Sequence, residues 1–190
     1  MRISGGSIAS GSLIIANHIS WLDIFVINAT SPAAFISKSE IKDWPLIGWL
    51  AIKNETLFLR RGCGAHARAI NEKIGTLLAK GRHVAIFPEG TTTDGSHVLN
   101  FHTALLQPAI ETGAPIQPLA IAYRLPDGRP TSAPAYYGDI TLLECIWATI
   151  AEPEIIVRVT VGTPLSAAHF SNRKELARHA RDHIVAAITY

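Results

Sequence analysis

The chain has 190 residues, of which 48% are hydrophobic and 17% are charged, and its formal net charge is +2. This length and composition fit one folded domain with a single apolar core, and they exclude a generally disordered chain. The charge is uneven, because the segment from Lys38 to Arg82 holds nine Lys/Arg against four Asp/Glu, a local balance of +5. Such a segment favours an anionic partner, and a phosphorylated small molecule, a lipid head group or a nucleic acid would each meet that requirement.

Metal sites, disulfides and membrane spans are not indicated. Cys63 and Cys145 are far apart and lack metal-ligand spacing, so we expect a reducing, cytosolic setting. His179 and His183 are four residues apart, but no third ligand accompanies them, so we expect a solvated helix face there. No apolar run is long enough to cross a bilayer and no signal-peptide pattern is present, which predicts a soluble or peripheral chain.

The chain alternates short apolar runs with segments of helical periodicity. Residues 1–12 are small and polar, so we expect a flexible lead-in with at most a few residues of edge strand, followed by one domain over residues 13–190. The alternation predicts an α/β fold with a central, mostly parallel or mixed sheet covered by helices. The expected strands are 13–16, 33–37, 56–59, 83–87, 116–123, 136–139 and 154–162, and the expected helices begin near residue 20 or cover 64–80, 103–112, 142–150 and 171–188.

One apolar segment, residues 41–52, does not fit a regular helix. Pro45 and Gly48 interrupt it, while Trp44 and Trp49 give it two large amphipathic side chains. We favour a contribution to the core, with a lipid-facing surface as the alternative.

The segment from Ile15 to Asp23 places a histidine and a carboxylate where an apolar strand ends. Ser20 followed three residues later by Asp23, just before an apolar run, predicts a helix start of the capping-box kind. A carboxylate near His18 can also fix its tautomer and stabilise the imidazolium, as an orienting acid does for a general base. The alternative is a helix cap beside an ordinary loop histidine. Both are compatible, since one carboxylate oxygen could cap the helix while the other holds His18.

Two further loops carry polar residues directly after predicted strands. Arg60 and Arg61 follow the strand at 56–59, and the sequence Glu-Gly-Thr at 89–91 follows the strand at 83–87. Because loops at one end of such a sheet share a crevice, the three loops together offer a base with its orienter, a cationic clamp, and a turn that holds an acceptor. Taken singly, a solvated strand end and an ordinary turn are the alternative interpretations.

Several common catalytic motifs are missing. The sequence has no Gly-x-Ser-x-Gly elbow, no P-loop and no Gly-x-Gly-x-x-Gly, which disfavours serine hydrolases, P-loop enzymes and dinucleotide enzymes. A base without a protein nucleophile suits direct transfer, in which the histidine deprotonates a substrate hydroxyl that attacks an activated acyl group.

These residues resemble the four motifs of the glycerolipid acyltransferase family, of the 1-acylglycerol-3-phosphate acyltransferase type. The motifs are Asn-His-x-x-x-x-Asp, Gly-x-x-Phe-x-x-Arg, Phe-Pro-Glu-Gly-Thr and a proline-containing apolar strand. In chain order the matching residues are Asn17, His18 and Asp23, then Phe58 and Arg61, then Phe87, Pro88, Glu89, Gly90 and Thr91, and last the segment 114–119 with Pro115 and Pro118.

The resemblance implies transfer of an acyl chain from a thioester of coenzyme A or acyl carrier protein to a lysolipid hydroxyl. It implies no metal or other cofactor and no nucleic-acid partner. His18 would be the general base and Asp23 its orienter, while the Arg61 and Glu-Gly-Thr region would hold the acceptor's head group and glycerol, and the proline strand would help place the acyl chain or its donor. The implied substrate-binding residues are Asn17, Phe58, Arg60, Arg61, Glu89, Gly90, Thr91, Pro115 and Pro118.

The sequence departs from the family pattern in three places. Glu55 stands at the glycine position of the second motif, and Thr92 and Thr93 stand where Arg-Ser is usual. The threonine variant is more like the branch that acylates lyso-ornithine lipid or other lysolipids. The family's N-terminal membrane segment is absent, which implies either peripheral attachment at the cytoplasmic face of the membrane through residues 44–49 or a shortened chain.

Two other functions stay open on the sequence. A thioesterase would use His18 with water in place of the lysolipid hydroxyl. A membrane-surface binding module without catalysis would use the basic segment from Lys38 to Arg82.

Overall fold

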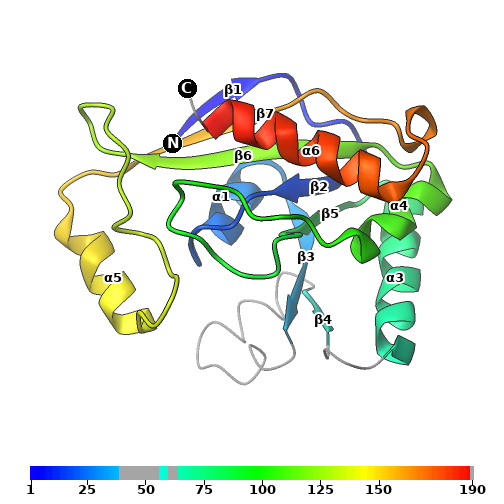
Figure 1. The fold of residues 1–190 in the computed structure, drawn as a ribbon, viewed down its shortest axis with the longest axis horizontal. Coiled ribbons are helices and arrows are strands. Elements are labelled where there is room, and N and C mark those ends of the chain that lie inside the picture. Colours follow the sequence, from blue (N-terminus) through cyan, green and yellow to red (C-terminus); the bar gives the residue numbers. More distant parts are fainter. Residues whose placement is uncertain (39–55, 60–63, 189–190) are drawn as a thin grey trace.

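Within residues 1–38, 56–59 and 64–188, which the computed structural model describes, a seven-stranded sheet has the order β1-β7-β6-β2-β5-β3-β4 (Figure 1). Its strands are β1 Arg2–Gly5, β2 Leu13–Ala16, β3 Ala33–Lys38, β4 Leu57–Leu59, β5 His83–Ile86, β6 Ile116–Arg124 and β7 Ile156–Val161. The helices are α1 Asp23–Thr30, α3 Gly64–Ala79, α4 Gln107–Thr112, α5 Leu142–Ala151 and α6 Arg173–Ile188, with 3₁₀ turns η2 Thr103–Leu106 and η3 Ala167–His169.

The sheet is mostly parallel. Strands β6 and β7 pair antiparallel, whereas the pairs β1–β7, β2–β6, β2–β5, β3–β5 and β3–β4 are all parallel. The carboxyl ends of β2, β5, β3 and β4 therefore lie at the same edge of the sheet, where their following loops can meet. This mixed sheet confirms the predicted fold class.

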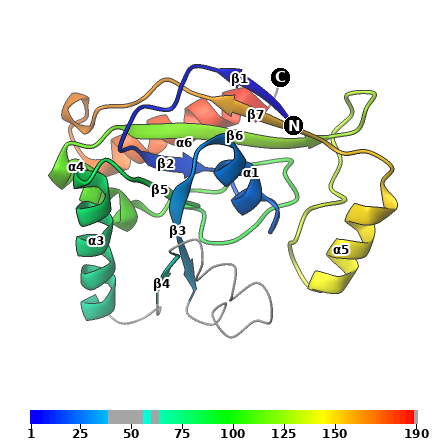
Figure 2. The ribbon, with the colours of Figure 1, turned by 180° about the vertical axis from the view of Figure 1, so that it is seen from behind.

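Helices cover both faces of the sheet, and β2 lies between two core clusters. All four residues of β2 are fully buried, as expected for a strand inside a parallel sheet. Its alternate side chains enter opposite clusters, one against α3, α4 and α6 and the other against α1. Figure 1 shows α6 in front of the sheet, and Figure 2, from behind, shows α1 in front. None of the helices in the described ranges is both long and apolar enough to cross a membrane.

The structure corrects three predicted elements. Helix α1 begins at Asp23, after a turn, and the Ser20 hydroxyl accepts from the Leu22 N–H without capping the helix. The strand expected at 136–139 is absent from this described segment, because the Tyr136 N–H donates to the loop carbonyl of Ile19 and residues 138–139 form a turn. The helix expected at 103–112 is split into η2 and α4, where Pro108 in the first turn of α4 has no N–H to continue the earlier turn.

The first twelve residues contain the edge strand that the sequence allowed. Strand β1 pairs parallel with β7, with Arg2 opposite Arg158. The flexibility expected of the lead-in stays a prediction.

Asn17 extends the pairing of β2 with β6 beyond the end of β2. Its side-chain Nδ2 donates to the Ile121 carbonyl at 2.9 Å, and the Ile121 N–H donates to its Oδ1 at 2.8 Å. The amide group thus takes the place of the next backbone unit, at a position that is 1% exposed. Because both Ile121 groups are buried, this pairing satisfies them and fixes where the chain leaves the sheet.

We expect Asn17→Ala to destabilise the fold by about 2–6 kcal/mol, since it leaves a buried N–H and a buried C=O unpaired at about 1–3 kcal/mol each. Urea unfolding of the variant and the parent measures this difference. Asn100→Ala, at an exposed position, is the matched control and should change the free energy of unfolding by less than about 0.5 kcal/mol. A loss below about 1 kcal/mol in N17A would contradict the structural role.

Candidate active site

His18 lies in the loop after β2, with its ring held on two sides. Its Nδ1 is 2.9 Å from Asp23 Oδ2, and its ring stacks on Phe87 with centroids 3.9 Å apart and planes 11° apart. A carboxylate only accepts hydrogen bonds, so Nδ1 carries the proton and the neutral ring keeps its lone pair on Nε2. The side chain is 22% exposed, so this geometry offers a base that is oriented and open to a substrate.

Asp23 is fully buried and holds the loop as well as the histidine. Its Oδ2 accepts from His18 Nδ1, from the Ile19 N–H at 2.7 Å and from the Ser20 N–H at 2.9 Å. The sequence allowed one carboxylate oxygen to cap the helix while the other held His18. The structure corrects this, because Oδ2 makes both sets of bonds and Oδ1 accepts from the Tyr123 hydroxyl at 2.7 Å.

Tyr123 is a site residue that the sequence analysis missed. It lies near the end of β6, is 3% exposed, and reaches Asp23 from one hundred positions along the chain. Burial, followed by the charge of Asp23, raises the pKa of its phenol, so the group stays protonated and donates. The alternation of β6 places its side chain on the α1 face with Leu119 and Ile121, but no local pattern names Asp23 as its partner.

Glu89 ties the loop after β5 to the loop after β2. Its Oε1 accepts from the His18 backbone N–H at 2.8 Å and its Oε2 accepts from the Leu99 N–H at 2.7 Å. The side chain is 4% exposed, and both oxygens are therefore engaged by the protein itself. Burial raises the pKa of Glu89, while the two N–H bonds and the nearby histidines act in the opposite direction.

The turn after Glu89 also contacts the histidine loop. Gly90 has a φ of +71°, the left-handed region that favours glycine, and its N–H donates to the Phe87 carbonyl at 3.1 Å. The Thr93 N–H donates to the His18 carbonyl at 2.9 Å. Thr91 is exposed at the surface of this turn. The loop after β2 and the loop after β5, two of the three predicted site loops, are therefore brought together around His18.

The remaining predicted residues are placed less closely or not at all. Arg60 and Arg61 lie outside the described residues, as does the segment with Trp44 and Trp49. Phe58 is half-buried on β4, which is separated from β5 by β3.

The two predicted prolines lie near the start of β6. The Leu13 N–H donates to the Pro115 carbonyl at 2.9 Å, and Pro118 pairs with Ile15 in the sheet. Both are therefore beside the body of β2, before the carboxyl end that carries His18. Their suggested role in placing the acyl chain stays a prediction.

No cluster of three or more metal-ligating side chains occurs among the residues that the structure describes. His179, on α6, packs its ring against Phe170 with centroids 5.1 Å apart. The expectation of an enzyme without metal or other cofactor stays a prediction.

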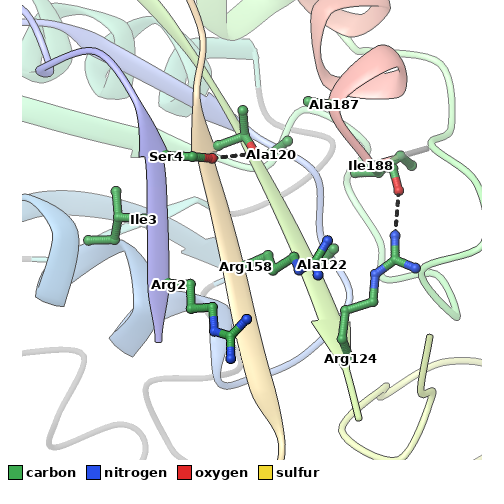
Figure 3. A pocket seen from close by; sticks show the side chains of 10 residues that line it. Arg2, Ile3, Ser4, Ala120, Ala122, Arg124, Arg158, Ala187 and Ile188 are labelled. Atoms are coloured by element: carbon green, nitrogen blue, oxygen red, sulfur yellow. Dashed lines mark hydrogen bonds between the residues drawn. The ribbon is translucent and has the colours of Figure 1, made fainter. Parts of the chain in front are cut away.

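A cleft of about 470 Å³ is lined by residues of β1, β6, β7 and α6 and does not include His18 (Figure 3). Arg2, Arg124 and Arg158 contribute to its lining from β1, β6 and β7, and Arg124 donates to the Ile188 carbonyl at 3.0 Å. Ala122 and Arg124 belong to the α6 face of β6, whereas Tyr123 points to the opposite face. None of the predicted site residues lines this cleft.

The raised pKa of Glu89 predicts a pH dependence of stability. A carboxyl group whose pKa is higher in the folded than in the unfolded protein favours folding at low pH, and that contribution is lost as the pH rises through the raised pKa. We therefore expect the free energy of unfolding of the parent to fall relative to Glu89→Gln as the pH rises above 4.5, the ordinary pKa of a glutamic acid, as measured by urea unfolding.

Glu144→Gln gives a control of opposite sign. The bonds from Thr141 lower the pKa of Glu144, so the parent should gain relative to E144Q as the pH rises. If the unfolding free energy of the parent relative to each variant changed equally with pH for E89Q and E144Q, the raised pKa of Glu89 would be contradicted.

The sequence matches the family model described as "Acyltransferase" over residues 6–122. A lyso-ornithine lipid O-acyltransferase of Pseudomonas aeruginosa is 40% identical over 188 residues, covering 99% of this chain and 72% of that protein. A 1-acyl-sn-glycerol-3-phosphate acyltransferase of Neisseria meningitidis is 35% identical over 179 residues, covering 94% of this chain and 70% of that protein.

A solved structure shares the fold. The crystal structure of the 1-acyl-sn-glycerophosphate (LPA) acyltransferase PlsC from Thermotoga maritima superposes with a TM-score of 0.69 at 23% identity, covering 99% of this chain and 70% of that one. The family model spans both loops that meet at His18, and the resemblance read from the four motifs is confirmed. The chain therefore belongs to the acyltransferase family and is an acyltransferase enzyme.

Proposed function

We propose that this acyltransferase moves a fatty acyl chain from a thioester of coenzyme A or acyl carrier protein to the hydroxyl of a lysolipid. Two relatives whose names specify lysolipid acceptors support the acceptor class. The observation that carries the mechanism is the His18 ring, bonded through Nδ1 to buried Asp23 at 2.9 Å while the side chain is 22% exposed.

In the proposed step, His18 Nε2 takes the proton of the lysolipid hydroxyl as its oxygen attacks the thioester carbonyl carbon. The tetrahedral intermediate then collapses, the carbon–sulfur bond breaks, and the proton passes from Nε2 to the leaving thiolate. Asp23 accepts the Nδ1 hydrogen bond throughout and stabilises the imidazolium that exists between the two transfers. The products are the diacylated lipid and a free thiol, so no redox partner is needed.

Among lysolipids, we propose lyso-ornithine lipid as the first acceptor and 1-acylglycerol-3-phosphate as the alternative. The 40% identical relative supports the first. The residues after Glu-Gly-Thr support it too, because Thr92 donates to the Tyr136 carbonyl and the Thr93 hydroxyl donates to the His97 carbonyl. Neither threonine supplies the cation that an arginine would offer to a phosphate.

Contacts with the acceptor are proposed for three parts of the chain. The turn at Gly90 and Thr91 lies beside His18, and Arg60 and Arg61 follow a strand whose carboxyl end is at the same sheet edge. In this arrangement Asn17 and Glu89 act through the protein, since both bind backbone groups in the structure. Phe58, Pro115 and Pro118 remain candidates for contact with an acyl chain.

We expect the purified protein to release thiol from an acyl thioester when a lysolipid is present, with His18→Ala lowering the rate about 10²- to 10⁴-fold. The panel is lyso-ornithine lipid, 1-acylglycerol-3-phosphate and a lysophospholipid, each with acyl-CoA and acyl-ACP. His169→Ala, at an exposed histidine, is the matched control and should keep the parent rate.

The same assay separates the other functions. Thiol release at the full rate without any lysolipid would identify a thioesterase that uses water. No turnover with any thioester would favour a binding module and would contradict the proposed transfer, as would an H18A rate within a fewfold of the parent.

Helix α5 offers an apolar face for contact with a lipid surface. Leu143, Trp147 and Ile150 are 70%, 69% and 62% exposed, and their spacing places them on one stripe of the helix. Both views show α5 standing apart from the sheet (Figure 1, Figure 2). Three large exposed apolar side chains, including a tryptophan, are typical of an interfacial helix.

The opposite face of α5 is tied to the segment that contacts the His18 loop. The Cys145 thiol donates to the Pro134 carbonyl at 3.3 Å, and the Tyr136 N–H, two residues on, donates to the Ile19 carbonyl at 2.9 Å. Burial raises the pKa of Cys145, and the neighbouring Trp21 side chain opposes that rise. A surface that seats α5 would thus lie near the loop that carries His18.

We therefore propose that α5 rests on a zwitterionic lipid surface that presents the lysolipid. Glu144 is the only charged residue between 142 and 151, so attraction to anionic lipid is not expected from this helix. The attachment expected of residues 44–49 falls outside the described residues and stays a separate possibility.

We expect the double variant L143Q/W147Q to lose most of the binding of the parent to phosphatidylcholine vesicles, measured by co-sedimentation, because it removes the largest apolar contacts. Ile3→Gln, on β1 where Ile3 is 52% exposed, is the matched control and should bind as the parent does. Vesicle binding by L143Q/W147Q equal to that of the parent would contradict the proposal. If analytical ultracentrifugation showed a dimer for the parent and a monomer for the variant, the face would be assigned to a second copy of the chain.

A further inference from the structure

Tyr123 is placed to fix the orientation of Asp23, the partner of His18. Its hydroxyl donates to Asp23 Oδ1 at 2.7 Å, and both side chains are buried, at 3% and 0% exposure. A hydrogen bond between a neutral donor and a buried carboxylate is stronger than one between neutral groups, because the charge has little water to solvate it.

The donor cannot be replaced by the other groups around Asp23. The Ile19 N–H, the Ser20 N–H and His18 Nδ1 all bind Oδ2, whereas the Tyr123 hydroxyl donates to Oδ1. Without that hydroxyl, a buried anionic oxygen would lose its donor, and the carboxylate plane would be held through one oxygen alone.

Tyr123 is itself held in the sheet by strand pairing. Strand β6 pairs with β2 on one side and with β7 on the other, where Tyr123 lies opposite Val157. Ile121, two residues earlier, exchanges two hydrogen bonds with the Asn17 amide: its carbonyl accepts one and its N–H donates the other. The phenol therefore anchors Asp23 to a central strand, whereas the three other donors come from the same short loop as the histidine.

We propose that Tyr123 is a positioning residue of this acyltransferase, acting through Asp23 on His18, an inference that rests on the proposed function. It holds the Asp23 carboxylate in the plane that accepts from His18 Nδ1, and so keeps the Nε2 lone pair aimed at the substrate hydroxyl. It does not contact the substrate, because its hydroxyl is buried against Asp23.

The variant Tyr123→Phe removes one oxygen atom and keeps the ring that packs in the core. We expect kcat to fall about tenfold or more. Losses of this size are typical when the hydrogen-bond partner that orients a metal-ligating side chain is removed from other enzymes. KM for the lysolipid and for the thioester should stay within about twofold of the parent, because uniform substrate binding is not touched. Tyr137→Phe, the same change at an exposed tyrosine, is the matched control and should leave both constants unchanged.

A second measurement does not depend on turnover. The ¹⁵N resonances of the His18 imidazole should show a proton on Nδ1 and none on Nε2 in the parent and in Y137F. In Y123F, a detectable population of the other tautomer or faster exchange of the Nδ1 proton is expected. Thermal unfolding of each variant confirms that it is folded at the assay temperature.

The outcomes are distinguishable. Y123F with the parent kcat and an unchanged His18 spectrum would overturn the inference while leaving the proposed function intact. A raised KM at constant kcat would also overturn it, since that result belongs to a residue that binds substrate. A parent protein without turnover on any acceptor would overturn the proposed function and the inference with it.

Discussion

The buried carboxylate of Asp23 is the group on which the site depends. A charge removed from water is costly unless donors replace the solvent, and Asp23, at 0% exposure, has four donors, three from the loop after β2 and one from β6. Satisfying that one charge fixes the loop after β2, the first residue of α1, the ring of His18 and the side chain of Tyr123 together. The arrangement of His18 and Asp23 and the local fold are therefore set by the same hydrogen bonds.

Strand β6 supplies the rigid reference for those bonds. Its Ile121 backbone exchanges two hydrogen bonds with the Asn17 side-chain amide on the β2 side. Its Tyr123 side chain donates a hydrogen bond to Asp23 on the α1 face. The two contacts bracket the histidine loop in sequence, since Asn17 precedes His18 and Asp23 follows it. Because both ends of the loop are tied to one central strand, a small shift of the loop would break bonds to buried groups.

The sequence predicted what is local and missed what is distant. His18 and Asp23 are five residues apart at a strand end, so their spacing carries a signal, and the strand periods carry the α/β fold. Tyr123 is 100 positions from Asp23, Ile121 is 104 from Asn17, and Glu89 is 71 from His18. A local sequence pattern does not distinguish a buried amide or carboxylate that binds backbone groups from one that binds substrate. The structure shows Asn17 and Glu89 bound to backbone groups, and the substrate-binding roles predicted for them stay predictions.

The two buried carboxylates near His18 act at different points of the residue. Glu89 holds its backbone N–H, Asp23 holds its ring Nδ1, and Phe87 stacks on the flat side of the ring. Three separate groups thus fix the backbone, the ring nitrogen Nδ1 and the ring plane of His18, and neither hydrogen bond involves Nε2. Glu89 binds two backbone groups, and burial raises its pKa. Asp23 thus holds the His18 ring, whereas Glu89 holds the backbone of the loop.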